Sequence, residues 1–173
     1  MPHPLHEQVR QAFGFRSGYC RVDETGAGAE LTVDHFRPSA VGGADDLENL
    51  VYACFRCNLY KGDYWPSPEE EAAGLYVLHP QRHNLADHLR ENSQTGHLEP
   101  LTVTGAFNIR LLHLNRPQLV ALRLERQALD IERQRLQLLQ VEIEQGEQTI
   151  RILQQYINFL LRLGAGKRSP EDD

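Results

Sequence analysis

Residues 31–61 read LTVDHFRPSAVGGADDLENLVYACFRCNLYK, and this stretch decides the fold of the chain. Two apolar segments, 31–33 and 50–53, are separated by a loop rich in proline and glycine, a pattern typical of paired strands. A Cys-x-x-Cys turn follows the second segment, and we expect a helix to begin near Asn58. The stretch therefore predicts two strands and a helix, a ββα unit.

Polar side chains stand at the ends of these predicted elements. Asp34 and His35 close the first strand, Asn49 precedes the second, and Asn58 follows the Cys-x-x-Cys turn. An aspartate, a histidine and two amides are the groups needed to hold one hard metal ion and to deprotonate a water molecule. The pattern predicts one metal site with a proton acceptor beside it.

This order, Asp-His, then Asn, then Cys-x-x-Cys-Asn-x-x-Lys, resembles the motif of the HNH nuclease family, whose fold is a treble-clef-like ββα-metal finger. The similarity covers roughly residues 14–125 and includes segments 96–102 (GHLEPLT) and 112–119 (LHLNRPQL), as in small stand-alone bacterial HNH proteins. The resemblance implies an α+β fold and an endonuclease that hydrolyses phosphodiester bonds in DNA.

The resemblance also implies roles for the motif residues. His35 is the general base that takes a proton from water, for which a pKa near neutrality is suited. Asp34 is the anionic ligand of a divalent ion, Mg²⁺ or Mn²⁺. Asn58 is the second protein ligand, and a side-chain amide oxygen suits Mg²⁺ better than zinc.

Further roles concern the loop and the phosphates. The family assigns to Asn49 the task of tying the loop so that His35 points correctly. Lys61 lies on the helical face that carries the amide ligand, and we expect it to contact phosphate. The other candidates for contacts to backbone phosphates are Arg37 and Arg56.

The cysteines indicate a zinc site that lacks one ligand, because a structural zinc ion requires four. The candidate ligands are Cys20, Cys54 and Cys57. HNH relatives that bind zinc carry a further Cys-x-x-Cys upstream, and here that motif reads Ser17-Gly-Tyr-Cys20. The alternatives are a fourth ligand from Asp23, His3 or His6, an empty site, or three buried thiols that pack the finger.

The flanking segments predict short mixed elements. Residues 4–15 have the apolar period of a helix. After the finger we expect a helix capped by Ser67, a strand over 75–80, a helix over 84–90, a strand over 98–103 and a helix over 107–114. Five histidines are spaced irregularly, which favours hydrogen bonding or packing over a metal cluster. They are His79, His83, His88, His97 and His113.

A long helix is predicted to start at Pro117. Apolar residues recur every seven positions along it, at Leu122, Leu129, Leu136, Ile143, Ile150 and Ile157, with companions at Leu139, Leu153 and Leu160. Such a seam predicts a coiled coil between chains, a homodimer or a complex with a partner protein. The alternative is a helix that folds back on its own domain and is broken at Gly146.

Composition is that of a water-soluble chain of 173 residues with 40% hydrophobic residues and a net charge of −6. We expect a cytoplasmic protein, since few cysteines and no apolar run of membrane-spanning length are present. The acidic balance weighs against tight non-specific DNA binding. We divide the chain into a finger with its N-terminal helix (1–65), a mixed α/β segment packed on it (66–115), a long helix (116–163) and a disordered tail (164–173).

Two functions follow from these observations. The first is a metal-dependent HNH endonuclease, with restriction or antiviral defence among its possible settings. The second is a non-catalytic, degenerate finger that serves as an assembly module through its C-terminal helix. A scaffold has no physical need for a base beside a metal ligand, which favours the first.

Overall fold

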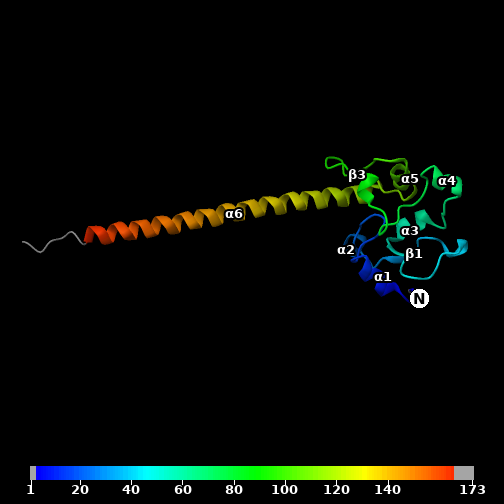
Figure 1. The fold of residues 1–173 in the computed structure, drawn as a ribbon, viewed down its shortest axis with the longest axis horizontal. Helices are drawn as coiled ribbons and strands as arrows, with labels where there is room; N and C mark the ends of the chain where they lie inside the picture. Colours follow the sequence, from blue (N-terminus) through cyan, green and yellow to red (C-terminus); the bar gives the residue numbers. More distant parts are fainter. Residues whose placement is uncertain (1–2, 166–173) are drawn as a thin grey trace, which may run out of the picture. The chain divides into compact units, whose positions relative to one another are not determined.

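A computed structural model describes residues 3–165 (Figure 1). The chain is mixed α+β and divides into two units, one ending at Arg126 and the other beginning at Gln127. The elements of the first unit are α1 (His6–Ala12), α2 (Glu24–Ala27), β1 (Thr32–His35), η1 (Ser39–Val41), β2 (Leu50–Ala53), α3 (Phe55–Lys61), α4 (Pro68–Ala72), η2 (Leu85–Asp87), β3 (Leu89–Glu91), β4 (Leu98–Pro100), α5 (Val103–Leu111) and the start of α6 (Pro117–Ala165).

The predicted ββα unit is confirmed. Strands β1 and β2 pair antiparallel, with Asp34 opposite Val51 and His35 opposite Leu50. Helix α3 follows at once, and it begins three residues before the predicted start at Asn58. The reason is the N-cap, because Cys54 is extended and its Sγ atom accepts a hydrogen bond from the backbone N–H of Cys57.

Strand β2 forms the centre of the hydrophobic core. All four of its residues are buried, and Tyr52 is among the largest fully buried side chains. Val9 of α1 belongs to the same core, so the predicted N-terminal helix packs on the finger as expected. Leu112 and Leu114 also belong to this core, which extends beyond the ββα unit.

The predicted strand over 75–80 is absent. That segment is held instead by one side chain, because the amide of Asn108 accepts a hydrogen bond from Leu78 N and donates one to Tyr76 O. A single buried amide thus replaces the ladder of a partner strand. The capping role predicted for Ser67 is confirmed, since Ser67 and Glu70 form a capping box at α4.

Element boundaries in the rest of this segment also differ from prediction. The helix expected over 84–90 is one 3-10 turn, η2, and the chain then enters strand β3 at Leu89. Strand β4 pairs with β3 and ends at Pro100, before the predicted limit at residue 103. Helix α5 starts at Val103 because Thr102 caps it and accepts a hydrogen bond from Gly105 N.

Helix α6 begins at Pro117, as predicted, and runs to Ala165. Its first turns pack into the core through Leu119, whereas residues 128–163 are exposed. The helix continues through Gly146, so the break considered there is wrong. The coiled coil stays a prediction. No described helix is long and apolar enough to cross a membrane. Of the tail expected at 164–173, residues 166–173 lie outside the described residues.

Candidate active site and metal centre

Asp34 is buried near the end of β1. Its carboxylate is 7% exposed and accepts a hydrogen bond from the hydroxyl of Tyr19 at 2.5 Å. The Nζ atom of Lys61 lies 3.2 Å from Oδ1. Burial raises the pKa of Asp34, although the nearby Lys61 charge opposes that rise. The carboxylate retains lone pairs beyond these contacts, so it can still act as a metal ligand.

His35, the next residue, is partly open to solvent. Its Nε2 atom lies 3.0 Å from Oδ1 of Asp45, and Nε2 of His3 lies 2.6 Å from the same oxygen. The hydrogen bond from His3 and then that from His35 lower the pKa of Asp45. The sequence motif did not indicate Asp45, because a contact across a ten-residue loop leaves no local pattern. Its signal is only an acidic residue within that loop.

The loop between β1 and β2 is closed by Asn49. Its amide oxygen accepts from Arg37 N at 2.8 Å, and its Nδ2 atom donates to Arg37 O at 3.0 Å and to Ala44 O at 2.8 Å. Gly43 fits against this closure, because a Cβ atom there would lie 1.8 Å from Arg37 O. The tie predicted for Asn49 is present, and its effect on catalysis stays a prediction.

Asp34, His35 and Asn58 line one pocket of about 250 Å³. The Nδ2 atom of Asn58 donates to Oγ1 of Thr32 at 3.2 Å, which fixes the amide plane. Among the described residues, its Oδ1 atom accepts no hydrogen bond and remains available to an ion. A carboxylate and an amide oxygen beside one pocket suit a hard divalent cation.

The environment of the Lys61 side chain differs from the exposed phosphate contact that the sequence predicted. Its side chain is fully buried, and Nζ donates to the backbone oxygen of His35 at 2.7 Å as well as pairing with Asp34. The face of α3 that carries Lys61 turns toward β1 rather than toward solvent, so the predicted phosphate contact is corrected to an internal ion pair.

The two candidate arginines lie apart from each other. Arg37 is exposed on the loop, where its Nε atom donates to Val41 O and its guanidinium covers the ring of Trp65. Arg56 is exposed on α3 and lines a different pocket from that of Asp34. The structure therefore brings Arg37 near the His35 loop and does not bring Arg56 to the same pocket.

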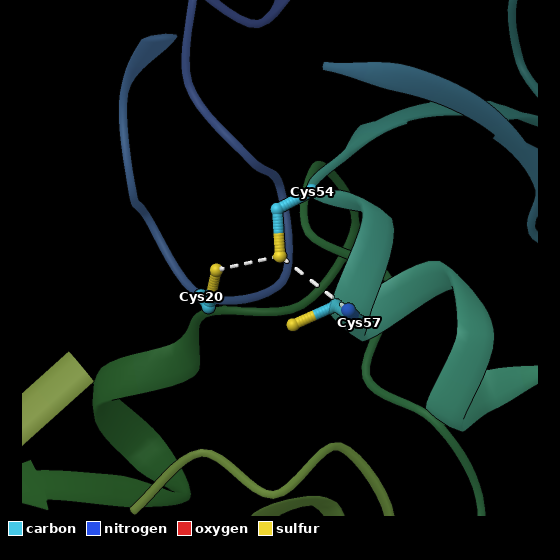
Figure 2. A group of neighbouring side chains, drawn as sticks. All are labelled: Cys20, Cys54 and Cys57. Atoms are coloured by element: carbon cyan, nitrogen blue, oxygen red, sulfur yellow. Dashed lines mark hydrogen bonds between the residues drawn. The ribbon is translucent and has the colours of Figure 1, made fainter. Parts of the chain in front are cut away.

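The three cysteines converge as predicted. Figure 2 shows their sulfur atoms turned toward one another, with Cys20 on the loop before α2 and the other two at the start of α3. The sulfurs of Cys20 and Cys54 are 3.5 Å apart, and all three lie within 4.8 Å of one another. Such a group could hold a zinc ion, for which Zn–S distances are about 2.3 Å. Hydrogen bonding from Cys20 and Cys57 lowers the pKa of Cys54.

No side chain proposed as the fourth zinc ligand reaches this cluster. His3 contacts Asp45, His6 lies 2.9 Å from Leu31 O, and Asp23 caps α2 by accepting from Gly26 N. Ser17 is fully buried, and its hydroxyl oxygen accepts from the backbone N–H groups of Cys20 and Cys54. Ser17 supports the two cysteine backbones and leaves the sulfurs one ligand short.

Comparison with protein families agrees with this geometry. Residues 18–64 match the family model of HNH endonuclease. This region is an HNH domain. No curated protein and no solved structure matches the chain. The matched region contains Asp34, His35, Asn49, Asn58 and Lys61, and it ends well before α6.

Beyond the HNH domain, Arg116 was missed by sequence reasoning. Its guanidinium lies 3.6 Å from Sγ of Cys57, 3.3 Å from Sγ of Cys54 and 3.8 Å from Sγ of Cys20. The residue is 59 positions or more from each cysteine in sequence, so no spacing rule connects them. The sequence feature that could have indicated Arg116 is its position directly before Pro117, the residue that begins α6.

The histidines after the HNH domain form no metal cluster among the described residues. His79 is buried, stacks edge-on against Phe36 at 4.4 Å and reaches Glu48 O. Burial lowers its pKa to about 4. His88 contacts the hydroxyl of Thr102, in keeping with the predicted hydrogen-bonding role.

Proposed function

We propose that this chain is a metal-dependent endonuclease that hydrolyses phosphodiester bonds in DNA. The observation that carries the proposal is the shared pocket of Asp34, His35 and Asn58 within the HNH domain. A base and two oxygen ligands that border one open space are the minimum set for metal-assisted attack of water on phosphorus. A role in restriction or antiviral defence in the cytoplasm is part of the proposal.

His35 is proposed as the general base. It stands at the edge of the pocket, partly open to solvent, where a water molecule can approach the imidazole. Asp45 accepts a hydrogen bond from Nε2, which fixes the ring and leaves Nδ1 to take the proton from water. Asp45 would thus be a positioning residue, while Asn49 holds the loop on which it stands.

Asp34 and Asn58 are proposed to hold the divalent ion, Mg²⁺ or Mn²⁺. When bound, the ion would stabilise negative charge on the phosphate and the leaving oxygen. Burial raises the pKa of the Asp34 carboxyl, and the Lys61 ammonium, 3.1 Å away, opposes that rise and so favours the ionised ligand. Contacts to DNA phosphates would then come from Arg37 beside the pocket, with Arg56 serving a more distant part of the strand.

We further infer that the cysteine cluster holds a structural zinc ion. Helix α3 starts inside that cluster, so the ion would fix the helix that carries Asn58 and Lys61. The exposed apolar side chains on residues 128–163 support a homodimer or a partner complex through α6. Two HNH domains in one dimer would offer a route to a double-strand break.

The second candidate function is a non-catalytic HNH scaffold that assembles through α6. The missing fourth zinc ligand at Ser17 and the net charge of −6 favour it. The retained base and ligands of the pocket oppose it, because an assembly module has no use for them.

Cleavage of supercoiled plasmid separates the two candidates. The wild type is incubated with Mg²⁺ or Mn²⁺, beside His35→Ala, an EDTA control and His97→Ala, a variant of an exposed histidine outside the HNH domain. The nuclease proposal expects cleavage by wild type and His97→Ala alone, with nicked or linear product reporting one or two cuts. Equal cleavage by wild type and His35→Ala would overturn the role of His35 as the base, whereas no cleavage of DNA by any folded protein would support the scaffold.

A further inference from the structure

The cysteine cluster carries a cation of its own. Arg116 directs both terminal nitrogens of its guanidinium at the three sulfurs, at distances of 3.3 to 3.8 Å. Distances in this range suit N–H···S hydrogen bonds, which are longer than those to oxygen. The same guanidinium donates to the carbonyls of Leu112 and His113, so the end of α5 fixes its position.

The charge of a loaded site explains the need for this residue. Three thiolates and one divalent ion leave one uncompensated negative charge, and a buried charge without a partner is costly. Cys57 is fully buried and Cys54 nearly so, which limits the compensation that water can supply. The positive charge of one guanidinium brings the net charge of the metal-bound cluster to zero.

We propose that Arg116 is the cationic outer partner of a three-thiolate centre for a soft divalent metal such as zinc. Arg116 neutralises the site by hydrogen bonding to the sulfurs. In a zinc site with four protein ligands, the fourth ligand would close the coordination sphere instead. This inference rests on the zinc site of the proposed function and is independent of DNA cleavage. Outer partners of this kind orient ligands and tune metal affinity.

A site with three protein ligands keeps one side open to exchange. Cys54 and Arg116 both line a pocket of about 540 Å³, so a metal ion or a chelator can approach the cluster from the side of Cys54. Pro117, the first residue of α6, lines the same pocket. Arg116, the residue before α6, therefore adds a polar link between the start of that helix and the cysteines.

The test measures zinc affinity of the full chain by competition with a chromophoric chelator. Arg116→Gln should bind zinc about 10- to 100-fold more weakly than wild type, the usual effect of removing an outer partner. Arg116→Lys should fall between them, because it keeps the charge and loses the fork of donors. The matched control is Arg123→Gln, which removes another buried arginine that donates to Gly96 O and Leu114 O and contacts no sulfur.

Arg116→Gln also loses its bonds to backbone carbonyls, so a lower stability alone decides nothing. The deciding quantity is the rise in melting temperature on adding zinc, since a ligand stabilises according to its own affinity. A smaller rise in Arg116→Gln than in Arg123→Gln supports the proposal. An equal rise overturns the role of Arg116, whereas a wild type that binds no zinc overturns the metal centre itself.

Substitution of Ser17 gives a second measurement. Ser17→Cys would offer a fourth thiolate, and cobalt bound in place of zinc should then show a stronger sulfur-to-metal charge-transfer band than in wild type. Loss of metal to a chelator should become slower. Identical spectra for the two proteins would mean that the wild-type site is already closed by another ligand and would overturn the open three-thiolate centre.

Discussion

The Nζ atom of Lys61 lies 3.1 Å from Oδ2 of Asp34, and the two side chains are 0% and 7% exposed. The same amine donates to the backbone oxygen of His35. One lysine on α3 therefore holds both the carboxylate proposed to bind the ion and the backbone of the proposed base.

Replacing Lys61 should be among the most damaging changes in the HNH domain. Lys61→Met leaves the Asp34 carboxylate buried without its cation, which costs about 3–5 kcal/mol of unfolding free energy in comparable buried pairs. The loss should shrink at acidic pH, because protonated Asp34 carries no charge. Urea denaturation measures it, with exposed Arg56→Met on the same helix as control. Equal losses in both variants would show that the ion pair contributes nothing.

Removing Asp45 should lower cleavage without changing the fold. Its side chain is 66% exposed, so Asp45→Ala should leave the melting temperature unchanged, while the imidazole of His35 loses its partner. We expect cleavage to fall by about tenfold, in line with the 10²–10⁴-fold contribution of a positioned base, of which orientation is one part. Glu48→Ala, in the same loop, is the control. Full activity in Asp45→Ala would exclude the positioning role.

Burial of His79 should make the protein sensitive to acid. Its pKa is about 4 in the folded chain, whereas an unfolded histidine takes up a proton near 6.5. Between these values the unfolded state binds more protons, so the stability conferred by neutral His79 is lost as pH falls from about 6.5 to 4.

That difference corresponds to about 3 kcal/mol at most. Denaturation curves at several pH values should show a weaker pH dependence over this window in His79→Gln than in wild type. His97→Gln, at an exposed position, should behave as wild type does. The same dependence of stability on pH in all three proteins would contradict the lowered pKa of His79.

The outer part of α6 should self-associate or bind a partner through its apolar seam. Leu139→Lys combined with Leu153→Lys places charges in the seam and should convert a wild-type dimer into monomers. Gln134→Lys with Gln148→Lys changes the opposite face by the same charge and should leave the dimer intact. Sedimentation equilibrium distinguishes these states. A wild-type monomer at micromolar concentration would leave a different protein as the partner of this helix.

The sequence predicted the ββα unit, the loop tie of Asn49, the cap of Ser67 and the convergence of the cysteines. Each of these has a local signal, such as strand alternation, a capping residue or a short Cys-x-x-Cys spacing. The prediction of a strand over 75–80 was wrong because the structure of that segment depends on a contact distant in sequence. Its apolar pattern is real, but Asn108, about 30 residues later, satisfies its backbone in place of a partner strand.

The partners of the candidate site were less accessible to sequence reasoning. The burial of Lys61 depends on which face of α3 meets β1, and helical periodicity over seven residues cannot decide that. Asp45 and Arg116 reach the base and the cysteines through the tertiary fold alone. The sequence motifs identified the candidate reactive groups. The side chains that orient and neutralise these groups could be identified only from the three-dimensional structure.

Gly43 contains no reactive group, yet random mutagenesis should identify it as essential. Any side chain there must displace the backbone of Arg37, and with it the end of the strand that bears His35. A genetic screen for loss of activity would therefore recover changes at this glycine as often as changes at the proposed base itself. Natural variants of this chain should almost always keep glycine at position 43. A substitution at this position would weaken the protein while leaving the proposed base and metal ligands unchanged.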